Sequence, residues 1–291
     1  MVSYRNVNDK ILLLDSSNEL DSHLQFNSEF ISTVLKDEPK VDLAMHIGHF
    51  SHLNVMQDKV KLVYSNFNKN NSILKQLLNG IKIAWIIRKY QRVIILSLDR
   101  YSFLSLLVFT YLRDFSIRKI VIIHHAWLSQ LKYSKLIKFL VFRSMKRFRN
   151  IVLGNWIIET LERFGINGAE LIPHPMSLCL ENTKYNIKKN SFRIGYLGNA
   201  HENKGFDVFA RLASNFRDNV HREFIVIGKR VDYVTKCERA NNIKFNCIEV
   251  QSNYDFLAEL IKCDLVVFPF PVYRYELYCS GVVFDCISQK V

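Results

Sequence analysis

The 291-residue sequence lacks several patterns that would assign it to a class directly. Its six cysteines include no Cys-x-x-Cys pair, so it predicts neither a zinc site nor a disulfide framework and is typical of a reducing compartment. It contains no Gly-x-Gly-x-x-Gly or P-loop motif. The longest apolar run, Tyr101 to Leu112, is bounded by arginines and is shorter than the roughly 20 residues of a membrane span, which predicts a buried helix.

A secretory leader is not expected either, because the first ten residues are polar where a signal peptide has its apolar core. No internal repeat is present. With 49% apolar residues, the chain has the composition of a globular protein, and its length allows two domains of ordinary size.

Acidic residues are scarce in one long stretch, and the formal net charge is +13. No Asp or Glu occurs from Ser116 to Asn150, whereas nine Lys and Arg alternate with bulky apolar residues. A basic helix of this kind is typical of interfacial membrane binding, so residues 131–149 predict contact with an anionic membrane surface. A solvated basic face above a packed one would show the same pattern. The sequence contains no recognisable nucleic-acid reader module, and we expect no nucleic-acid partner.

Strand-length apolar runs alternate with helical patterns along the first half. Ile11 to Leu14 and Val41 to Ile47 flank a helical pattern at Phe26 to Leu35, which together make a βαβ unit. The alternation continues with predicted helices at 73–90, 103–112 and 157–164 and predicted strands at 93–98, 119–123 and 151–153. This order predicts the α/β class, with a parallel sheet covered on both faces.

Histidines stand where ligands of open α/β sheets gather, beyond the carboxyl ends of strands. There are three such positions: His46 with His49, His124 with His125, and His174. A histidine there can hydrogen-bond a substrate hydroxyl or move a proton near neutral pH. We interpret the first pair as structural. For the second pair, capping of the strand end or packing beside Trp127 is the alternative.

A domain boundary is predicted near residue 180. Ala169 to Met176 contains two prolines, which favour extended backbone, and Glu181 to Asn190 has the polar composition of a linker. The chain then divides into domains 1–180 and 181–291. The alternation restarts in the second domain, with predicted strands at 193–197, 223–227, 244–248 and 265–268.

The segment from Phe192 to Asp207 predicts a strand, a polar loop and a helix. Gly198 ends the strand and allows another group to approach the backbone closely. The helix that follows offers free N–H groups and the positive end of its dipole, and Lys204 adds a full charge. Such a corner suits a phosphate. Alternatively, Gly198 and Gly205 are ordinary turn residues and Lys204 is a solvated lysine.

Residues 196–207, Tyr-Leu-Gly-Asn-Ala-His-Glu-Asn-Lys-Gly-Phe-Asp, resemble the first strand-to-helix junction in the donor half of GT-B glycosyltransferases of the retaining, metal-independent group. In those enzymes an arginine and a lysine contact the donor diphosphate. Lys204 matches the lysine, and Asn199 stands at the arginine position. The resemblance implies two Rossmann-like domains, no cofactor and no metal, and the Asp-x-Asp metal motif of the other glycosyltransferase architecture is absent.

Residues Cys263 to Pro271 contain an acidic residue, then an apolar run of strand length and then prolines, and this order resembles the same family. Residues Tyr273 to Ser288 also resemble it, at the place where relatives carry two glutamates eight positions apart. Asp285 matches the second acid, which is expected to hold the donor ribose. Glu276 lies nine positions before it and is the stand-in for the first acid.

Further donor contacts are implied at two other turns. Ser280 and Gly281 would open a helix whose N–H groups face the diphosphate. Gly228 and Lys229 place a turn glycine and a cation at the end of a neighbouring strand.

The segment Ile-Val-Ile-Ile-His-His-Ala-Trp, residues 120–127, resembles the acceptor-half strand of these enzymes, in which a histidine faces the reacting sugar. The resemblance implies a catalytic role for His125, or for His124 if the register differs by one residue.

The function implied is transfer of a sugar from a nucleotide-diphosphate sugar to a glycan or lipid-linked acceptor, in cell-surface polysaccharide biosynthesis, in the cytoplasm or at the inner face of the cell membrane. The second domain shows four strands where about six are common, so we expect it to be truncated relative to the family. The alternatives are a nucleotide-sugar epimerase of the same fold and a catalytically silent, truncated relative that acts as a binding protein.

Overall fold

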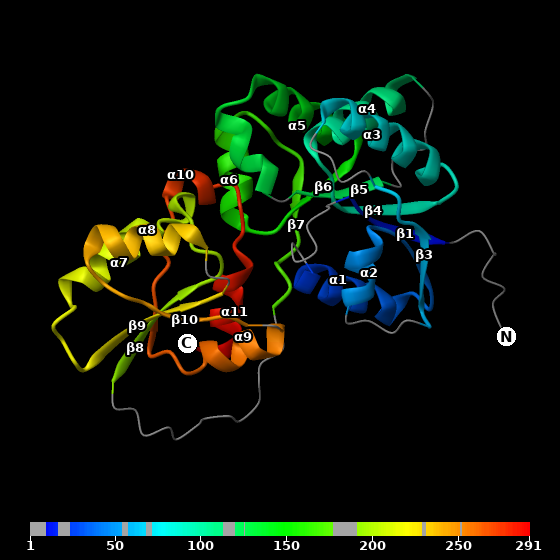
Figure 1. The fold of residues 1–291 in the computed structure, drawn as a ribbon. Coiled ribbons are helices and arrows are strands. Elements are labelled where there is room, and N and C mark those ends of the chain that lie inside the picture. Colours follow the sequence, from blue (N-terminus) through cyan, green and yellow to red (C-terminus); the bar gives the residue numbers. More distant parts are fainter. Residues whose placement is uncertain are drawn as a thin grey trace. The chain divides into compact units, whose positions relative to one another are not determined.

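Two parallel β-sheets organise the chain, one in each of two units (Figure 1). The computed structural model describes residues 10–16, 24–53, 58–67, 72–112, 120–124, 126–176, 191–228, 231–250 and 252–291. The first unit comprises Met1–Pro175 together with Glu276–Cys279, and the second comprises Met176–Tyr275 together with Ser280–Val291. The boundary predicted at residue 180 falls outside the described residues and stays a prediction.

The first unit contains a seven-stranded sheet in the order β3-β2-β1-β4-β5-β6-β7, and each pair of neighbouring strands is parallel. Strand β1, the third in this order, is buried along its whole length. The direction of winding reverses between β1 and β4, which is where open α/β sheets bind ligands. The strands are β1 (Ile11–Asp15), β2 (Val41–Ala44), β3 (Val60–Tyr64), β4 (Arg92–Ser97), β5 (Ile120–Ile123), β6 (Arg149–Val152) and β7 (Ala169–Leu171).

Helices cover both faces of this sheet. Helices α3, α4 and α5 form a layer on one face, and α1 and α2 lie on the other (Figure 1). A core of buried side chains joins α3 and α4 to β1 and β4. The helices are α1 (Leu24–Asp37), α2 (Ile47–His52), α3 (Ile73–Ile87), α4 (Arg100–Leu112), the 3₁₀ helix η2 (Ala126–Lys132), α5 (Lys135–Arg147) and α6 (Asn155–Arg163).

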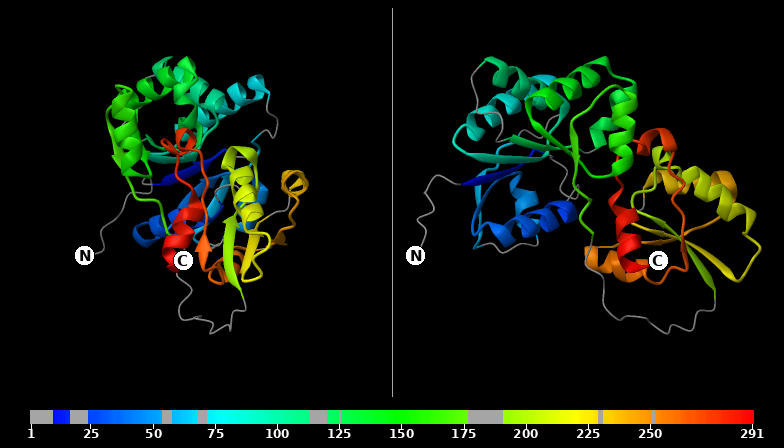
Figure 2. Two further views of the ribbon diagram at one scale, coloured as in Figure 1. Left: turned by 90° about the vertical axis from the view of Figure 1, so that its left-hand side faces the viewer. Right: turned by 180° about the vertical axis from the view of Figure 1, so that it is seen from behind.

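The second unit contains a four-stranded parallel sheet in the order β10-β9-β8-β11, flanked by helices on both sides (Figure 2). An aromatic core that includes Tyr196, Phe206 and Phe209 fills one side of the sheet. The elements are β8 (Phe192–Leu197), the 3₁₀ helix η3 (Glu202–Lys204), α7 (Phe206–Asn215), β9 (Arg222–Ile227), α8 (Asp232–Asn241), β10 (Asn246–Ile248), α9 (Asn253–Leu260), β11 (Leu265–Val266), α10 (Val272–Tyr275) and α11 (Gly281–Gln289).

The predicted α/β class, the parallel sheets and the four strands of the second unit are confirmed, but two details in the first unit are wrong. The strand predicted to reach Ile47 ends at Ala44, because His46 caps the N-terminus of α2 and accepts a hydrogen bond from the Gly48 backbone N–H. The helix predicted to be buried, α4, packs only one face into the core and exposes Val108 and Leu112.

The close packing of α3 on α4 depends on Gly80. A Cβ atom at this position would lie 2.1 Å from the carbonyl oxygen of Ser102 in α4. We therefore expect Gly80→Ala to lower the free energy of unfolding by about 1–3 kcal/mol despite its better helix propensity, because the helices would have to move apart. Urea denaturation measures this. Lys82→Ala, at an exposed position of the same helix, is the control, and equal stability of the two variants would contradict the expectation.

Candidate functional site

The corner after β8 brings a cation and a helix start together in the second unit. Gly198 has φ +82°, a left-handed conformation that favours glycine, and its N–H donates to the carbonyl oxygen of Ile227 over 2.8 Å. A Cβ at Gly198 would lie 3.9 Å from Lys204 Nζ and 3.9 Å from Cγ1 of Val282, in the first turn of α11. The Lys204 ammonium and the N-terminal turn of α11 therefore both lie beside Gly198.

Two further glycines allow the neighbouring loops to close on this corner. Gly228, at the end of β9, has φ +146°, and a Cβ there would lie 2.7 Å from the carbonyl oxygen of Gly198. Gly205 has φ +71°, and a Cβ there would lie 1.9 Å from the carbonyl oxygen of Pro269, which follows β11. The segments after β8, β9 and β11 thus meet backbone against backbone, as glycine alone permits.

Buried aromatic side chains hold the backbone around Lys204 in place. Tyr196 is buried in β8, and its hydroxyl donates to the carbonyl oxygen of Lys204 over 3.4 Å. Burial raises the pKa of Tyr196 above its ordinary value, so the phenol stays a neutral donor. Phe206, the first residue of α7, packs against the Tyr196 ring with the centroids 4.9 Å apart. Position 204 is therefore anchored in the core of the unit, while Lys204 Nζ reaches the vicinity of Gly198.

Helix α11 presents its N-terminus without a side-chain cap. Ser280 is the N-cap residue, and its hydroxyl makes no capping hydrogen bond. A Cβ at Gly281 would meet no atom within 4 Å, so the space beside the helix start is open. The first backbone N–H groups of a helix have no partner inside it. Asp285 is half-buried one turn further on, and next to it burial raises the pKa of the Cys286 thiol to about 12, with the Asp285 charge as a smaller cause.

The other predicted donor contacts are placed differently. Asn199 is exposed directly after Gly198. Glu276 belongs to the first unit, where its carboxylate forms an ion pair with the ammonium of Lys132. Lys229 lies outside the described residues. The donor roles of these three residues stay predictions.

In the first unit, His124 is a buried, hydrogen-bonded histidine at the end of β5. Its Nε2 lies 2.7 Å from Oδ1 of Asn150, so Nε2 carries the proton. Asn150 in turn donates to the carbonyl oxygens of Ser144 and Phe148 and accepts a hydrogen bond from the Ser144 hydroxyl. Burial lowers the pKa of His124 to about 4, against a smaller opposing effect of Asn150. His124 is therefore neutral at physiological pH. His125 lies outside the described residues, and the catalytic roles predicted for this pair stay predictions.

A second buried polar network was not foreseen from the sequence. Asn27 Nδ2 donates to Asp15 Oδ2 over 2.5 Å and lies 3.0 Å from His49 Nε2, and all three side chains are almost fully buried. The network lies beyond the carboxyl end of β1, where the Ser16 N–H donates to the carbonyl oxygen of Ser97 and so joins the ends of β1 and β4. The sequence feature that could have indicated this network is Asp15, a carboxylate at the end of a buried strand, because a buried charge needs hydrogen-bonding partners.

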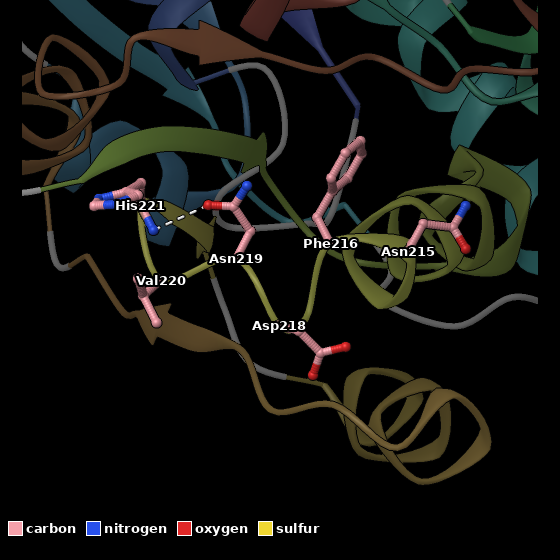
Figure 3. Close-up of a pocket in the computed structure, with 6 residues that line it drawn as sticks. All are labelled: Asn215, Phe216, Asp218, Asn219, Val220 and His221. Atoms are coloured by element: carbon pink, nitrogen blue, oxygen red, sulfur yellow. Dashed lines mark hydrogen bonds between the residues drawn. The ribbon is translucent and has the colours of Figure 1, made fainter.

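His174, the third histidine position predicted, is held by local contacts. His174 Nδ1 lies 2.7 Å from the carbonyl oxygen of Pro175, and its ring packs on Phe26. Within the described part of the chain, no three His, Cys, Asp or Glu side chains are grouped to hold a metal ion. The hollow in Figure 3 lies at the turn between α7 and β9, at the opposite end of β9 from Gly228, and is lined by Asn215, Phe216, Asp218, Asn219, Val220 and His221.

These features define the class as α/β proteins with two Rossmann-like units, and comparison with solved structures identifies the fold. Anabaena HepE (Alr3699), in complex with UDP-glucose, is similar with a TM-score of 0.61 and 16% identity over 94% of this chain and 82% of that one. Sucrose-phosphate synthase from Thermosynechococcus elongatus is similar with a TM-score of 0.66 and 11% identity over 96% and 79%. UDP-GlcNAc 2-epimerase from Neisseria meningitidis, bound to UDP-GlcNAc, is similar with a TM-score of 0.55 and 13% identity over 88% and 76%.

The chain therefore has the GT-B glycosyltransferase-like fold, as its sequence motifs predict, and the epimerases share this fold. No family model and no curated protein matches the sequence. At 11–16% identity the likeness shows the fold alone.

The low pKa of His124 makes stability depend on pH. Its pKa is about 4 in the folded chain and about 6.5 in the unfolded chain, so the unfolded state binds the proton more tightly. The contribution of His124 to the free energy of unfolding is therefore fully present above about pH 6.5 and is lost as the pH falls toward 4. We expect the free energy of unfolding to drop by about 2–3 kcal/mol from this group between pH 7 and pH 4.5. Urea denaturation of the wild type and of His124→Gln measures the difference, and an equal pH dependence in the two proteins would contradict it.

Proposed function

We propose that the protein is a metal-independent glycosyltransferase that moves a sugar from a nucleotide-diphosphate donor to a glycan or lipid-linked acceptor. The observation that carries the proposal is the corner at Gly198, where the Lys204 ammonium and the first turn of α11 lie beside the same backbone atoms. An ammonium and free helical N–H groups together form an anion site that matches a pyrophosphate.

The chemistry follows from where charge develops during transfer. When the bond between the sugar and the diphosphate breaks, negative charge grows on the departing phosphate oxygen. The positive charge of Lys204 and the N–H dipoles at Ser280 and Gly281 stabilise this negative charge, because both are in place before the reaction. The Asp285 carboxylate, one turn into α11, accepts hydrogen bonds from the donor ribose. Gly205 and Gly228 let the loops after β8, β9 and β11 close around this corner.

Two of the similar structures support this class of donor, since HepE was solved with UDP-glucose and the Neisseria epimerase with UDP-GlcNAc. On the acceptor side, His125 bonds or deprotonates the reacting hydroxyl, and His124 holds the end of β5 in place. The expected setting is the cytoplasm, at the inner face of the cell membrane, with residues 131–149 toward anionic lipid and a product in cell-surface polysaccharide. Retention of configuration is proposed from the motif resemblance.

A nucleotide-sugar epimerase is the second candidate, favoured by the similarity to the UDP-GlcNAc 2-epimerase from Neisseria meningitidis. A silent relative is the third, because Asn199 replaces the cation expected beside the diphosphate. Isothermal titration with UDP and GDP separates the third from the others, since a silent relative shows no binding. Nuclear magnetic resonance of the sugar after incubation separates the first two, since only an epimerase inverts a sugar carbon without transfer.

Removal of the Lys204 charge tests the donor site. We expect Lys204→Ala to weaken nucleoside diphosphate binding by about tenfold or more, the usual effect of losing a charge-assisted hydrogen bond. Isothermal titration with UDP and GDP gives the affinity. Lys244→Ala, an exposed lysine before the amino end of β10, should bind like the wild type. An unchanged affinity in Lys204→Ala would remove this residue from the site.

The catalytic assignment is tested at His125. We expect His125→Ala to slow release of nucleoside diphosphate from a bound sugar nucleotide by roughly 10²-fold or more, the usual contribution of acid–base catalysis, with diphosphate affinity unchanged. A panel of UDP- and GDP-sugars is screened by coupled detection of the released diphosphate. His52→Ala, an exposed histidine at the end of α2, is the control. Full activity of His125→Ala would end its proposed role.

A further inference from the structure

The layer formed by α3, α4 and α5 exposes an unusual number of large apolar side chains. Eleven of the 25 large hydrophobic side chains exposed in the described chain belong to these three helices. Leu74 is 66% exposed and Trp85 is 53% exposed. The helices lie side by side on one face of the seven-stranded sheet (Figure 1), and the full set is Ile73, Leu74, Leu78, Ile81, Trp85, Val108, Tyr111, Leu112, Leu136, Phe139 and Phe142.

The same layer is basic, because its helices contain eight Lys and Arg residues. Its three helices contain no Asp or Glu. Residues 59–158 contain 19 of the 40 Lys and Arg but two of the 27 Asp and Glu, so they carry +17 and the rest of the chain carries −4. One of the two acids, Asp99, accepts hydrogen bonds from the N–H and the hydroxyl of Ser102. The net charge of +13 therefore arises in this part of the first unit.

On α5 the exposed aromatic rings lie next to cations. Arg143 Cζ is 5.2 Å from the ring centroid of Phe139, and Lys146 Nζ is 4.3 Å from that of Phe142. The opposite face of α5 is buried in the core through Ile137, Leu140, Val141 and Ser144. On the outer face, Phe139 is 49% exposed and Phe142 is 40% exposed. Aromatic rings with cations beside them can bind at the boundary between lipid headgroups and acyl chains. There the ring is buried among the acyl chains and the cation contacts a headgroup phosphate.

Phe139 also lines two apolar hollows on this surface. One is lined by Lys135, Lys138, Phe142 and Phe164, and the other by Leu104, Val108, Tyr111 and Arg143. Both have apolar side chains together with basic ones. A lipid molecule has the same division, with an anionic phosphate above an apolar chain.

We propose that the outer surface of α3, α4 and α5, termed the docking layer, binds the surface of an anionic lipid bilayer. Its apolar side chains enter between the headgroups, and its Lys and Arg side chains contact lipid phosphates. This extends the contact predicted for residues 131–149 to all three helices and requires no nucleotide or sugar. The charge disfavours a second copy of the chain as the occupant, because two such surfaces repel each other. No helix in the described ranges is long and apolar enough to span a bilayer.

Co-sedimentation of the full chain with vesicles tests the charge requirement. Vesicles of phosphatidylcholine alone are compared with vesicles containing 30% phosphatidylglycerol, at low and high salt. We expect binding to the anionic vesicles, weakened by salt. Each charge removed in Lys135→Gln and Lys138→Gln should weaken binding by roughly fivefold. Binding that ignores phosphatidylglycerol, or no binding to either vesicle, would overturn the proposal.

Paired variants test the apolar requirement. The double variant Phe139→Ser, Phe142→Ser should bind anionic vesicles about tenfold or more weakly, because two rings no longer leave water. The matched control is Val220→Ser with Tyr254→Ser, which removes side chains of 84% and 64% exposure from the second unit and should bind like the wild type. Equal loss in both double variants, or in neither, would contradict a specific docking layer.

Tryptophan fluorescence gives a readout that does not depend on the folding of a multiple variant. Trp85 is exposed on α3, so its emission should shift to the blue and be quenched by brominated lipid when anionic vesicles are added, and Trp85→Phe should remove this signal. An unchanged spectrum would overturn insertion. Isothermal titration of UDP and GDP against the Phe139→Ser, Phe142→Ser variant should match the wild type, so that loss of vesicle binding and failure of the donor site are distinguished. Vesicle-independent dimers in light scattering would instead assign the layer to a second copy.

Discussion

Direct backbone contact between the ends of β8 and β9 is the constraint on which the proposed donor site depends. A Cβ at Gly228 would lie 2.7 Å from the carbonyl oxygen of Gly198, so a side chain at this position would force the two loops apart. Because the loops touch, the corner after β8 stays narrow enough for Lys204 and the start of α11 to adjoin it. A rigid site of this kind can hold an anion without reorganising, which is the condition for electrostatic catalysis.

The first unit uses buried polar side chains where the second uses glycine. Asn27 joins Asp15 to His49, and Asn150 joins His124 to the backbone around Ser144. Hydrogen bonds in a low dielectric are strong and directional, and leaving a member unpaired is costly, so such networks hold loops in one position. Both networks occur at the carboxyl ends of strands, where open α/β sheets bind their ligands.

The outer surface of α3, α4 and α5 is apolar and basic, and the packing of the core does not account for this composition. A helix that packs on a sheet needs one apolar face, and α5 has this face in Ile137, Leu140 and Val141. Its outer face carries half-exposed rings with cations beside them. Exposed apolar area is unfavourable in water, so a surface of this size is typical of an interaction site. The positive charge of the chain is concentrated in residues 59–158, which include these three helices.

Much of the fold could be predicted from the sequence, because strands and helices have local periods of two and 3.6 residues that remain visible in the residue order. Gly198 and Lys204 were predicted for the same reason, since strand, turn and helix lie within a few residues. The short edge strands β3 and β7 and the end of β2 at Ala44 were not, because pairing partners and the cap at His46 decide them.

The sequence by itself therefore determined the α/β class, the four strands of the second unit and the corner after β8. Only the tertiary structure decided that Asp15, Asn27 and His49 form one network and that α4 exposes one of its faces. Contacts between residues far apart in the chain depend on the order of strands in the sheet, and no local period encodes that order.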